Sequence, residues 1–445
     1  MKSVALAVEE RTPHGIAGAI SRLITTGDLA PGDRLPTVRD LAKDLGVSPA
    51  TVSHAWQTLA AAGLITSRGR SGSFVRSAPR EWMPRRYQGL DGSLEAALDL
   101  SGGTPDPALL PRIAPLLAGL EIHVDTASYR AKPDIPELHD LLRATWPSPP
   151  ESLTVTNGAL DAIDRVLATL VRYGDRVLLE NPAFPPFLDL LDAYGLEPVG
   201  VEMDADGMLP DAFARALGTA PAVVLLQTRA HNPTGASLSE ERAAQLGRLL
   251  IRSRTAPNAI VIEDDHSGSI SSSPDVTLAS AVPDRVLHVK SFSKSHGPDL
   301  RIGALGGPRA LVDRVVARRL LGPGWTSRTI QAILHSLLTD ADAVAQVDAA
   351  RTAYAERRAA LQAELLAAGV ELPPGDGINA WLPVAEERSA LVHLAAAGIR
   401  VAPGAPFQLG EAPAPHLRVT VGMVPVESAR EVARALAAAA TADGS

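Results

Sequence analysis

The chain has 445 residues, which is too long for one ordinary hydrophobic core, so two or three domains are expected. Its 46% of hydrophobic and 21% of charged residues are typical of a globular protein, and its net charge of −8 gives no overall nucleic-acid signature. There is no cysteine, which excludes a disulfide framework, thiol catalysis and a zinc-finger site. The apolar run near the N-terminus is too short for a signal peptide, and no apolar run could span a bilayer, so we expect a cytoplasmic protein.

Charge is distributed unevenly along the chain. Residues 1–76 contain nine lysines and arginines against six acidic residues, a net charge of +3 within a chain of net charge −8. The N-terminal end is therefore the basic end of an acidic protein. Such a basic end is typical of a module that faces DNA.

Within this basic end, apolar spacing predicts three short helices. The first covers residues 14–26. The second follows Thr37, a suitable N-cap, and ends at Gly46. The third follows Ser48 as N-cap and has Pro49 at its first position, where proline is favoured. Two short helices joined by a tight glycine turn predict a helix-turn-helix.

A hairpin is predicted directly after the third helix. Residues 64–66 and 73–75 are strand-like and enclose the basic, glycine-rich tip RGRSG. Such a hairpin beside a helix-turn-helix is a wing. A small helical domain without a nucleic-acid role fits the helical periodicity equally well, but Arg68 and Arg70 in the wing favour DNA.

The ordered run GDLAPGDRLPTVRDLAKDLGVSPATVSHAWQTLAAAGLITSRGRSGSFV closely resembles the GntR-type winged helix over its whole length. In that family the third helix enters the major groove and the wing approaches the minor groove. Some members have arginine where Pro49 and Ser53 stand here, so we expect a weaker contribution from backbone contacts. The resemblance implies a phosphate contact by Arg39, DNA-facing positions at Ser48, Ala50, Thr51 and Ser53, candidate base readers at His54 and Gln57, and backbone contacts by Arg68, Arg70 and Gly72.

Residues 77–98 sustain no helical or strand period and contain several prolines, glycines and serines, so they are predicted to be a linker. We interpret its arginines, Arg80, Arg85 and Arg86, as part of a solvated tether, with contact to DNA or to the second domain as the alternative. The expected domains are thus a winged helix at 11–76, a linker at 77–98 and a large domain at 99–445, with a small C-terminal subdomain from about residue 325.

The large domain alternates short apolar strands with helical patterns, which predicts a mostly parallel sheet covered by helices. In such sheets ligand groups collect on loops at the carboxyl ends of the strands. The strand candidates are residues 177–179, 199–201, 223–226, 260–262, 286–289 and 302–305, and the helical segments include 160–171, 188–194 and 240–251.

One polar loop after a predicted strand contains Ser291, Ser293, Lys294 and Arg301. A lysine whose pKa is lowered can form a Schiff base with an aldehyde, and hydroxyl and guanidinium groups can hold a phosphate. An aldehyde and a phosphate on one ligand suggest pyridoxal phosphate. A solvated basic loop between two strands remains the alternative for these residues alone.

Four further features suit the same ligand. A loop of small residues at 156–160 precedes a helix and suits a phosphate, and Phe184 between prolines could lie against a ring. Asn232 in AHNPTG could bond a ring hydroxyl, and a carboxylate in EDDH could keep a pyridine nitrogen protonated. Arg418 on a predicted strand could clamp a carboxylate. Each feature alone also has a structural explanation, as a helix start, a core phenylalanine, a turn, a solvent-facing acid or a surface arginine.

From about residue 100 to the end, the order of these motifs resembles the type I fold of pyridoxal-phosphate-dependent aminotransferases. The family usually has tyrosine where His266 stands, and we expect the charge of an imidazole there to depend on pH. Asp134 stands where glycine is usual, which predicts a changed entrance to the site. The resemblance implies that Lys294 is the Schiff-base lysine, that Asp264 pairs with the pyridine nitrogen, and that Arg418 binds an effector carboxylate. It further implies that Asn232 and His266 bind the ring hydroxyl and that Phe184 stacks on the ring. The phosphate cup implied by the resemblance consists of Gly158, Ala159, Ser291 and Arg301, with Tyr129 of a neighbouring subunit.

A GntR-type winged helix followed by an aminotransferase-like domain is the architecture of MocR-type transcriptional regulators, which the chain resembles end to end. The resemblance implies a homodimer with head-to-tail large domains that binds double-stranded operator DNA and senses an amine or amino acid through an aldimine at Lys294. Two alternatives stay open, a regulator that senses pyridoxal phosphate itself and a working aminotransferase with a DNA-binding appendage. No metal site is predicted.

Overall fold

The computed structural model divides the chain into two compact units, Met1–Arg85 and Arg86–Ser445. Three predicted site residues, Tyr129, Arg68 and Arg70, lie outside the described residues, as does most of the predicted linker. The structure describes residues 4–5, 7–8, 11–26, 28–30, 32–61, 65–67, 72–75, 84, 86, 96–120, 131–410 and 414–442.

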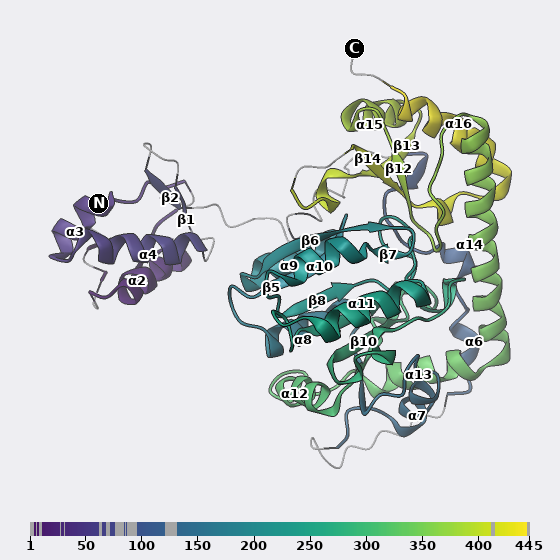
Figure 1. Ribbon diagram of the computed structural model, residues 1–445, viewed down its shortest axis with the longest axis horizontal. Coiled ribbons are helices and arrows are strands. Elements are labelled where there is room, and N and C mark those ends of the chain that lie inside the picture. Colours follow the sequence, from purple (N-terminus) through teal and green to yellow (C-terminus); the bar gives the residue numbers. More distant parts are fainter. Residues whose placement is uncertain are drawn as a thin grey trace. The chain divides into compact units, whose positions relative to one another are not determined.

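Among the described residues, the N-terminal unit contains the predicted helices α2, α3 and α4 and a two-stranded antiparallel hairpin (Figure 1). The predicted caps are confirmed, since Thr37 accepts from the backbone N–H of Asp40 at 3.2 Å and Ser48 accepts from that of Thr51 at 3.1 Å. Gly46 ends the second helix in the left-handed conformation, at φ 67°. The elements are α2 (Pro13–Thr26), α3 (Val38–Leu45), α4 (Pro49–Ala61), β1 (Ile65–Ser67) and β2 (Ser73–Val75).

Apolar side chains from all three helices and both strands form the core of this unit. The side chains on the predicted inner face of the third helix are all buried, which confirms the predicted apolar face with its helical period of 3.6 residues. The polar side chains of the same helix are left on its opposite face. The buried inner-face residues are Val52, Ala55, Trp56 and Leu59.

The large unit is organised around an eight-stranded sheet in the order β4-β11-β10-β9-β8-β5-β6-β7. The pairs from β10 through β9, β8 and β5 to β6 are parallel, whereas β11 runs antiparallel to both of its neighbours. The predicted mostly parallel sheet is therefore confirmed. The strands are β4 (Ser152–Thr156), β5 (Arg176–Asn181), β6 (Glu197–Asp204), β7 (Gly207–Met208), β8 (Val223–Leu226), β9 (Ile260–Asp265), β10 (Val286–Ser291) and β11 (Gly303–Gly307).

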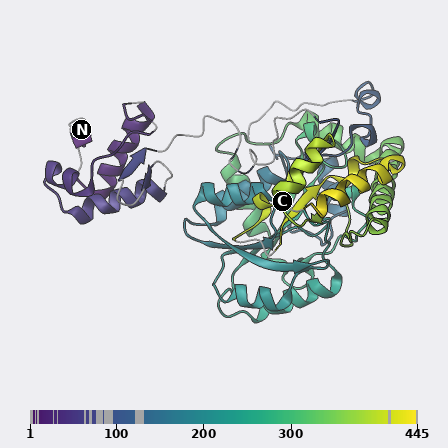
Figure 2. The ribbon, with the colours of Figure 1, turned by 90° about the horizontal axis from the view of Figure 1, so that it is seen from above.

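Helices cover both faces of this sheet (Figures 1 and 2). One face packs against α8 (Ala159–Leu170), α9 (Pro185–Tyr194) and α12 (Arg309–Arg319), and the other against α10 (Pro210–Leu217) and α11 (Glu240–Arg252). Because side chains alternate along a strand, neighbouring residues of β9 and β10 project into different layers. This alternation decides which acidic residues can reach the candidate site.

The large unit also contains a second, smaller sheet of four strands in the order β12-β14-β13-β3. Its edge strand β3 comes from the start of the unit and pairs in parallel with β13, which the sequence did not predict. None of the helices in the described part of the chain combines the length and the apolar character that a membrane span needs. The elements are β3 (Leu98–Leu100), β12 (Ala380–Pro383), β13 (Ile399–Pro403), β14 (His416–Val419), α14 (Ala341–Ala367), α15 (Glu387–Ala396) and α16 (Ala429–Ala440).

The long helix α14 runs beside both sheets in Figure 1 and contributes to the core under the small one. The preceding helix α13 (Arg328–Thr339) packs instead with α7 (Pro136–Ala144), β4 and β11. The small sheet therefore includes β3, and its core contains residues of α14 but none of α13. A further short helix, α6 (Ala114–Leu117), lies near α13.

Candidate cofactor and DNA-binding sites

Strand register brings the predicted ligand groups to one end of the large sheet. Asp264 on β9 lies opposite Val289 on β10, two residues before Ser291. Ser291 pairs with Gly303, and Gly303 pairs with Thr156 at the end of β4, directly before the loop that starts α8. Segments far apart in the sequence thus meet where parallel strands end.

The first component is a cup of small residues at the N-terminus of α8. Gly158 has φ 103°, and a Cβ there would lie 3.2 Å from Nη2 of Arg301. A Cβ on Gly303 would lie 2.9 Å from the carbonyl carbon of Gly158 and 3.1 Å from the backbone nitrogen of Ala159, so both positions need glycine for close approach. Helix N–H groups, a guanidinium and the Ser291 hydroxyl form a donor set that suits a phosphate.

The second component is Lys294, a partly buried lysine whose ammonium donates to the carbonyl oxygen of Gly103. Burial is the main cause that lowers the pKa of Lys294 to about 8. The positive charge of Arg418 lowers this pKa further, while the carboxylate of Asp264 opposes the shift. A substantial share of this amine is therefore neutral near pH 7.5 and has a free lone pair for attack on an aldehyde.

The third component is a pair of buried polar side chains with open acceptor atoms. Asp264 accepts from Nε2 of Gln227 through Oδ2 at 2.9 Å, but its Oδ1 has no partner among the described residues. The Oδ1 atom of Asn232 also has no partner there. Burial raises the pKa of Asp264 to about 7. Because buried polar atoms are normally bonded, these open positions indicate a ligand with polar groups.

His266, two residues after Asp264, is partly buried. Its Nε2 is 3.2 Å from the Ser267 hydroxyl, and its Nδ1 has no partner among the described residues. Burial, with a smaller contribution from Lys294, lowers the pKa of His266 to about 3. The expectation that its charge varies with pH is therefore wrong for the physiological range, where the ring is neutral.

Two further predicted residues come from the start of α9 and from β14. Phe184 is the partly exposed N-cap of α9, with its ring 5.3 Å from that of Phe187 in an edge-to-face arrangement. Arg418 on β14 is only 2% exposed, so it is not a surface arginine. It donates to the carbonyl of Ser101, its Nε has no described partner, and burial lowers its pKa to about 10.

Asp134, where the family usually has glycine, supports the sheet beside the cup. Its Oδ1 accepts from the backbone N–H of Val155 at 2.8 Å and from the Thr154 hydroxyl at 3.3 Å. Both partners belong to β4, whose end leads into the Gly158 loop. The acid therefore anchors the segment at 131–135 to this strand.

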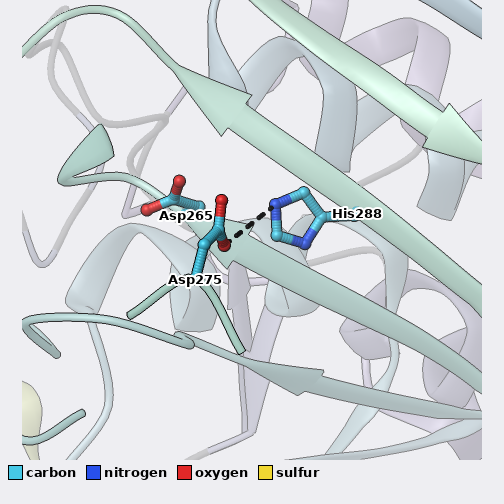
Figure 3. A group of neighbouring side chains, drawn as sticks. All are labelled: Asp265, Asp275 and His288. Atoms are coloured by element: carbon cyan, nitrogen blue, oxygen red, sulfur yellow. Dashed lines mark ion pairs between the residues drawn. The ribbon is translucent and has the colours of Figure 1, made fainter. Parts of the chain in front are cut away.

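A second buried polar cluster lies on the opposite face of the same strands. Asp265, Asp275 and His288 each offer a ligand atom within 4.8 Å of the others, and Figure 3 shows the Asp275 carboxylate directed toward the imidazole. Arg229, however, donates two hydrogen bonds to the carboxylate of Asp265, at 2.5 and 3.1 Å, and the ammonium of Lys290 lies 3.3 Å from the carboxylate of Asp275. Two cations already neutralise these carboxylates, so the geometry favours an ion-pair network over a metal centre.

Sequence reasoning missed the residues that join these segments. Gln227 bonds both Asp264 and the backbone of Asn232, and the pair of Arg229 with Asp265 ties the loop after β8 to the end of β9. Strand alternation could have assigned Asp264 and Asp265 to different faces. No sequence pattern predicts the bond between Gln227 and Asp264, because it joins the loop after β8 to strand β9.

In the N-terminal unit the predicted DNA-facing positions that the structure describes are all exposed or partly exposed. Gly72 has φ 102°, and a Cβ there would lie 3.0 Å from Nε of Arg34, so Arg34 lies against the wing and adds a cation that the sequence analysis missed. Arg39, Ser48, Ala50, His54 and Gln57 are exposed, and Thr51, Ser53 and Gly72 are partly exposed.

The structure corrects one interpretation of the linker. Nη1 of Arg86 lies 3.0 Å from Oδ1 of Asp189 and 2.7 Å from Oδ2 of Asp192, both on α9. Its backbone N–H also donates to Asp189 at 3.0 Å. Arg86 is therefore docked on the large unit and is not a solvated tether residue. Arg80 and Arg85 lie outside the described residues.

Comparison with known proteins agrees with both halves of this architecture. Residues 13–75 match the family model of bacterial regulatory proteins of the gntR family, and residues 100–436 match that of class I and II aminotransferases. The chain is 36% identical over 419 residues to the vitamin B6 salvage pathway transcriptional repressor PtsJ of Salmonella typhimurium, covering 93% of this chain and 95% of the relative. It is 29% identical to the HTH-type pyridoxine biosynthesis transcriptional regulator PdxR of Corynebacterium glutamicum, over 79% of this chain and 78% of the relative.

Solved structures agree on the fold of the large unit. The kynurenine aminotransferase of Pyrococcus horikoshii superposes with a TM-score of 0.69 at 21% identity, over 78% of this chain and 91% of that chain. LysN, an alpha-aminoadipate aminotransferase from Thermus thermophilus, gives 0.68 at 22% identity, over 82% of this chain and 98% of that chain. Fold and motifs together define a DNA-binding transcription regulator built on an aminotransferase fold. The chain belongs to the MocR type of the GntR family of regulators.

Proposed function

We propose that this protein is a transcription regulator that carries pyridoxal phosphate on Lys294 and adjusts its affinity for operator DNA when an amine or amino acid reacts there. The observation that carries the proposal is the combination of Lys294 with buried Asp264 and Asn232, whose Oδ1 atoms have no described partner, and with the glycine-lined cup at Gly158 and Gly303. The protein would act as a cytoplasmic homodimer with head-to-tail large units.

The residues present fit the cofactor group by group. Pyridoxal phosphate supplies an aldehyde that combines with amines and a ring that withdraws electrons. Lys294 would hold the aldehyde end, Asp264 the ring nitrogen, and Asn232 with neutral His266 the ring hydroxyl. Phe184 would cover the ring face. Gly158, Ala159, Ser291 and Arg301 would hold the phosphate, together with Tyr129 of the neighbouring subunit.

Arg418 supports an effector that carries a carboxylate. It is buried near Lys294, and both cations donate hydrogen bonds to backbone carbonyls of the short segment 101–103. Arg418 donates to Ser101 and Lys294 donates to Gly103. A carboxylate is a better partner for a buried guanidinium than a carbonyl is. An amino acid effector would therefore free this segment, which directly follows β3 and the linker. That release is a route by which effector binding could shift the balance between two conformations.

The second candidate signal is pyridoxal phosphate itself. The names of PtsJ and PdxR assign those regulators to vitamin B6 salvage and pyridoxine biosynthesis. In this case cofactor binding alone would change operator affinity, and Arg418 would have no regulatory ligand. A working aminotransferase is the third alternative, and it requires release of a keto acid.

One experiment separates these candidates. The visible spectrum and the operator affinity of the full chain are followed as apoprotein, after addition of pyridoxal phosphate, and then with amino acids and amines added singly. A lasting spectral shift that changes operator affinity, without keto acid, supports amine sensing. A full change of affinity with pyridoxal phosphate alone supports the second candidate, and conversion to pyridoxamine phosphate with keto-acid release supports an enzyme. No spectral change with pyridoxal phosphate would refute the cofactor.

A further inference from the structure

Gln227, the first residue after β8, links the two buried residues that the cofactor ring requires. Its Nε2 donates to Oδ2 of Asp264 at 2.9 Å, and its Oε1 accepts from the backbone N–H of Asn232 at 2.8 Å. The two partners fix the orientation of the amide, because a carboxylate needs a donor and an N–H needs an acceptor. One planar group thus sets the separation between Asp264 and Asn232.

The position of Gln227 is itself fixed by a third buried residue. Glu180, at the end of β5, accepts from the backbone N–H of Gln227 with both carboxylate oxygens, at 3.1 and 3.2 Å. Burial raises the pKa of Glu180 to about 8. The side chain of Gln227 is 4% exposed, so solvent cannot replace its bonds. The chain from Glu180 through Gln227 to Asp264 therefore connects three neighbouring parallel strands below the site.

We propose that Gln227 is a positioning residue for pyridoxal phosphate, which holds Asp264 and Asn232 at the spacing of the ring nitrogen and the ring hydroxyl. The inference rests on the proposed cofactor. It explains why each partner keeps one atom open, since Gln227 occupies Oδ2 of Asp264 and the backbone N–H of Asn232, and both Oδ1 atoms have no partner among the described residues.

The same amide favours the ionised form of Asp264. Burial and the negative charge of Asp265 oppose ionisation, whereas the hydrogen bond from Gln227 and the charges of His288 and Lys294 favour it. Loss of the amide donor should therefore raise the pKa of Asp264 and weaken its interaction with a protonated ring nitrogen. A merely structural glutamine would leave the electronic state of a bound ring unchanged.

The test compares Gln227→Leu and Gln227→Glu with wild type in the full-length protein. Gln227→Leu removes both bonds at similar volume, and Gln227→Glu keeps an acceptor for Asn232 but sets a third acid beside Asp264 and Glu180. Gln245→Leu is the matched control, because that glutamine bonds exposed Glu241 on α11, away from the site. The readouts are the dissociation constant for pyridoxal phosphate, the pH dependence of the visible spectrum, and the thermal midpoint of the apoprotein.

We expect Gln227→Leu to bind pyridoxal phosphate roughly 10- to 100-fold more weakly, as expected for loss of a hydrogen bond to a charged group. Gln227→Glu should change the pH profile of the visible spectrum between about pH 6 and 9 relative to wild type and control, because a further acid beside Asp264 has to share a proton with it. Wild-type affinity and spectra in both variants would overturn the assignment, as would a lower thermal midpoint without either change. A wild-type chain that does not bind pyridoxal phosphate would overturn this inference together with the proposed cofactor.

Discussion

The described candidate DNA-binding residues are exposed or partly exposed and lie within one short stretch of the chain from Arg39 to Gly72, whereas the core of the cofactor set, with Asp264, Asn232 and Ser291, is buried and comes from segments far apart in the sequence. In the first region each contact is made separately with DNA, so losses should be moderate, spread over sequences and sensitive to salt. In the second region, polar groups share one network within the protein, so removing one member leaves others without partners. We therefore expect single substitutions to have larger effects in the cofactor region than in the DNA-binding region.

The largest effect is expected from Lys294→Ala, which removes the amine that would hold the cofactor covalently. The visible absorbance of the lysine-bound cofactor should be lost, while the circular dichroism of the winged helix should stay unchanged, because Lys294 and the winged helix lie in different compact units. The same absorbance in the variant would contradict the assignment of Lys294.

The next effect is expected at Arg418. Replacement by leucine removes a buried guanidinium that would pair with a carboxylate, a bond worth about 1.5–3 kcal/mol. Binding of amino acids, measured through the spectrum, should weaken roughly 10- to 100-fold, whereas amines without a carboxylate should bind as in wild type. Equal losses for both ligand types would show that Arg418 acts only on the structure of the small sheet.

The pH dependence of cofactor attachment sharpens the comparison, since the reactive lysine belongs to the cofactor region, where burial lowers its pKa. The pKa of Lys294 is lowered to about 8, so the neutral, reactive fraction rises between pH 7 and 9 and then levels off. The rate of attachment of pyridoxal phosphate should follow that curve in stopped-flow absorbance. A rate that keeps rising toward pH 10.5, the ordinary lysine value, would contradict the effect of burial. His266 should add no step near pH 6.5, because its ring is neutral there.

A smaller effect is expected from Arg39→Ala at the exposed surface. Loss of one phosphate contact should weaken operator and nonspecific DNA alike, by about tenfold or less, and should reduce the slope of log affinity against log salt by about 1. Electrophoretic mobility shift at several salt concentrations measures both. A loss confined to one base position of the operator would instead make Arg39 a base reader.

The smallest effect is expected from Arg86→Ala. Its ion pairs with Asp189 and Asp192 on α9 are partly exposed, so the free energy of unfolding of the large unit should fall by only about 0–1 kcal/mol. Urea denaturation measures this change, with Arg388→Ala on exposed α15 as a matched control. A loss well above that range would mean that the contact holds more of the unit together.

The same contrast explains what the sequence could predict. Helix ends in the N-terminal unit depend on local signals such as Thr37, Ser48 and Gly46, and the structure confirms them. The order of motifs predicted which segments would meet at the sheet edge. It could not predict β3 in the small sheet, the Gln227 bridge or the neutral state of His266, because these depend on long-range pairing and on burial.

The most direct test of the account is operator affinity measured in parallel for wild type and Lys294→Ala, as apoprotein, with pyridoxal phosphate, and with pyridoxal phosphate plus each amino acid that shifts the spectrum. The account predicts that at least one such amino acid changes the operator affinity of wild type and has no effect on the variant. Operator affinity that stays constant under every ligand that alters the wild-type spectrum would contradict it.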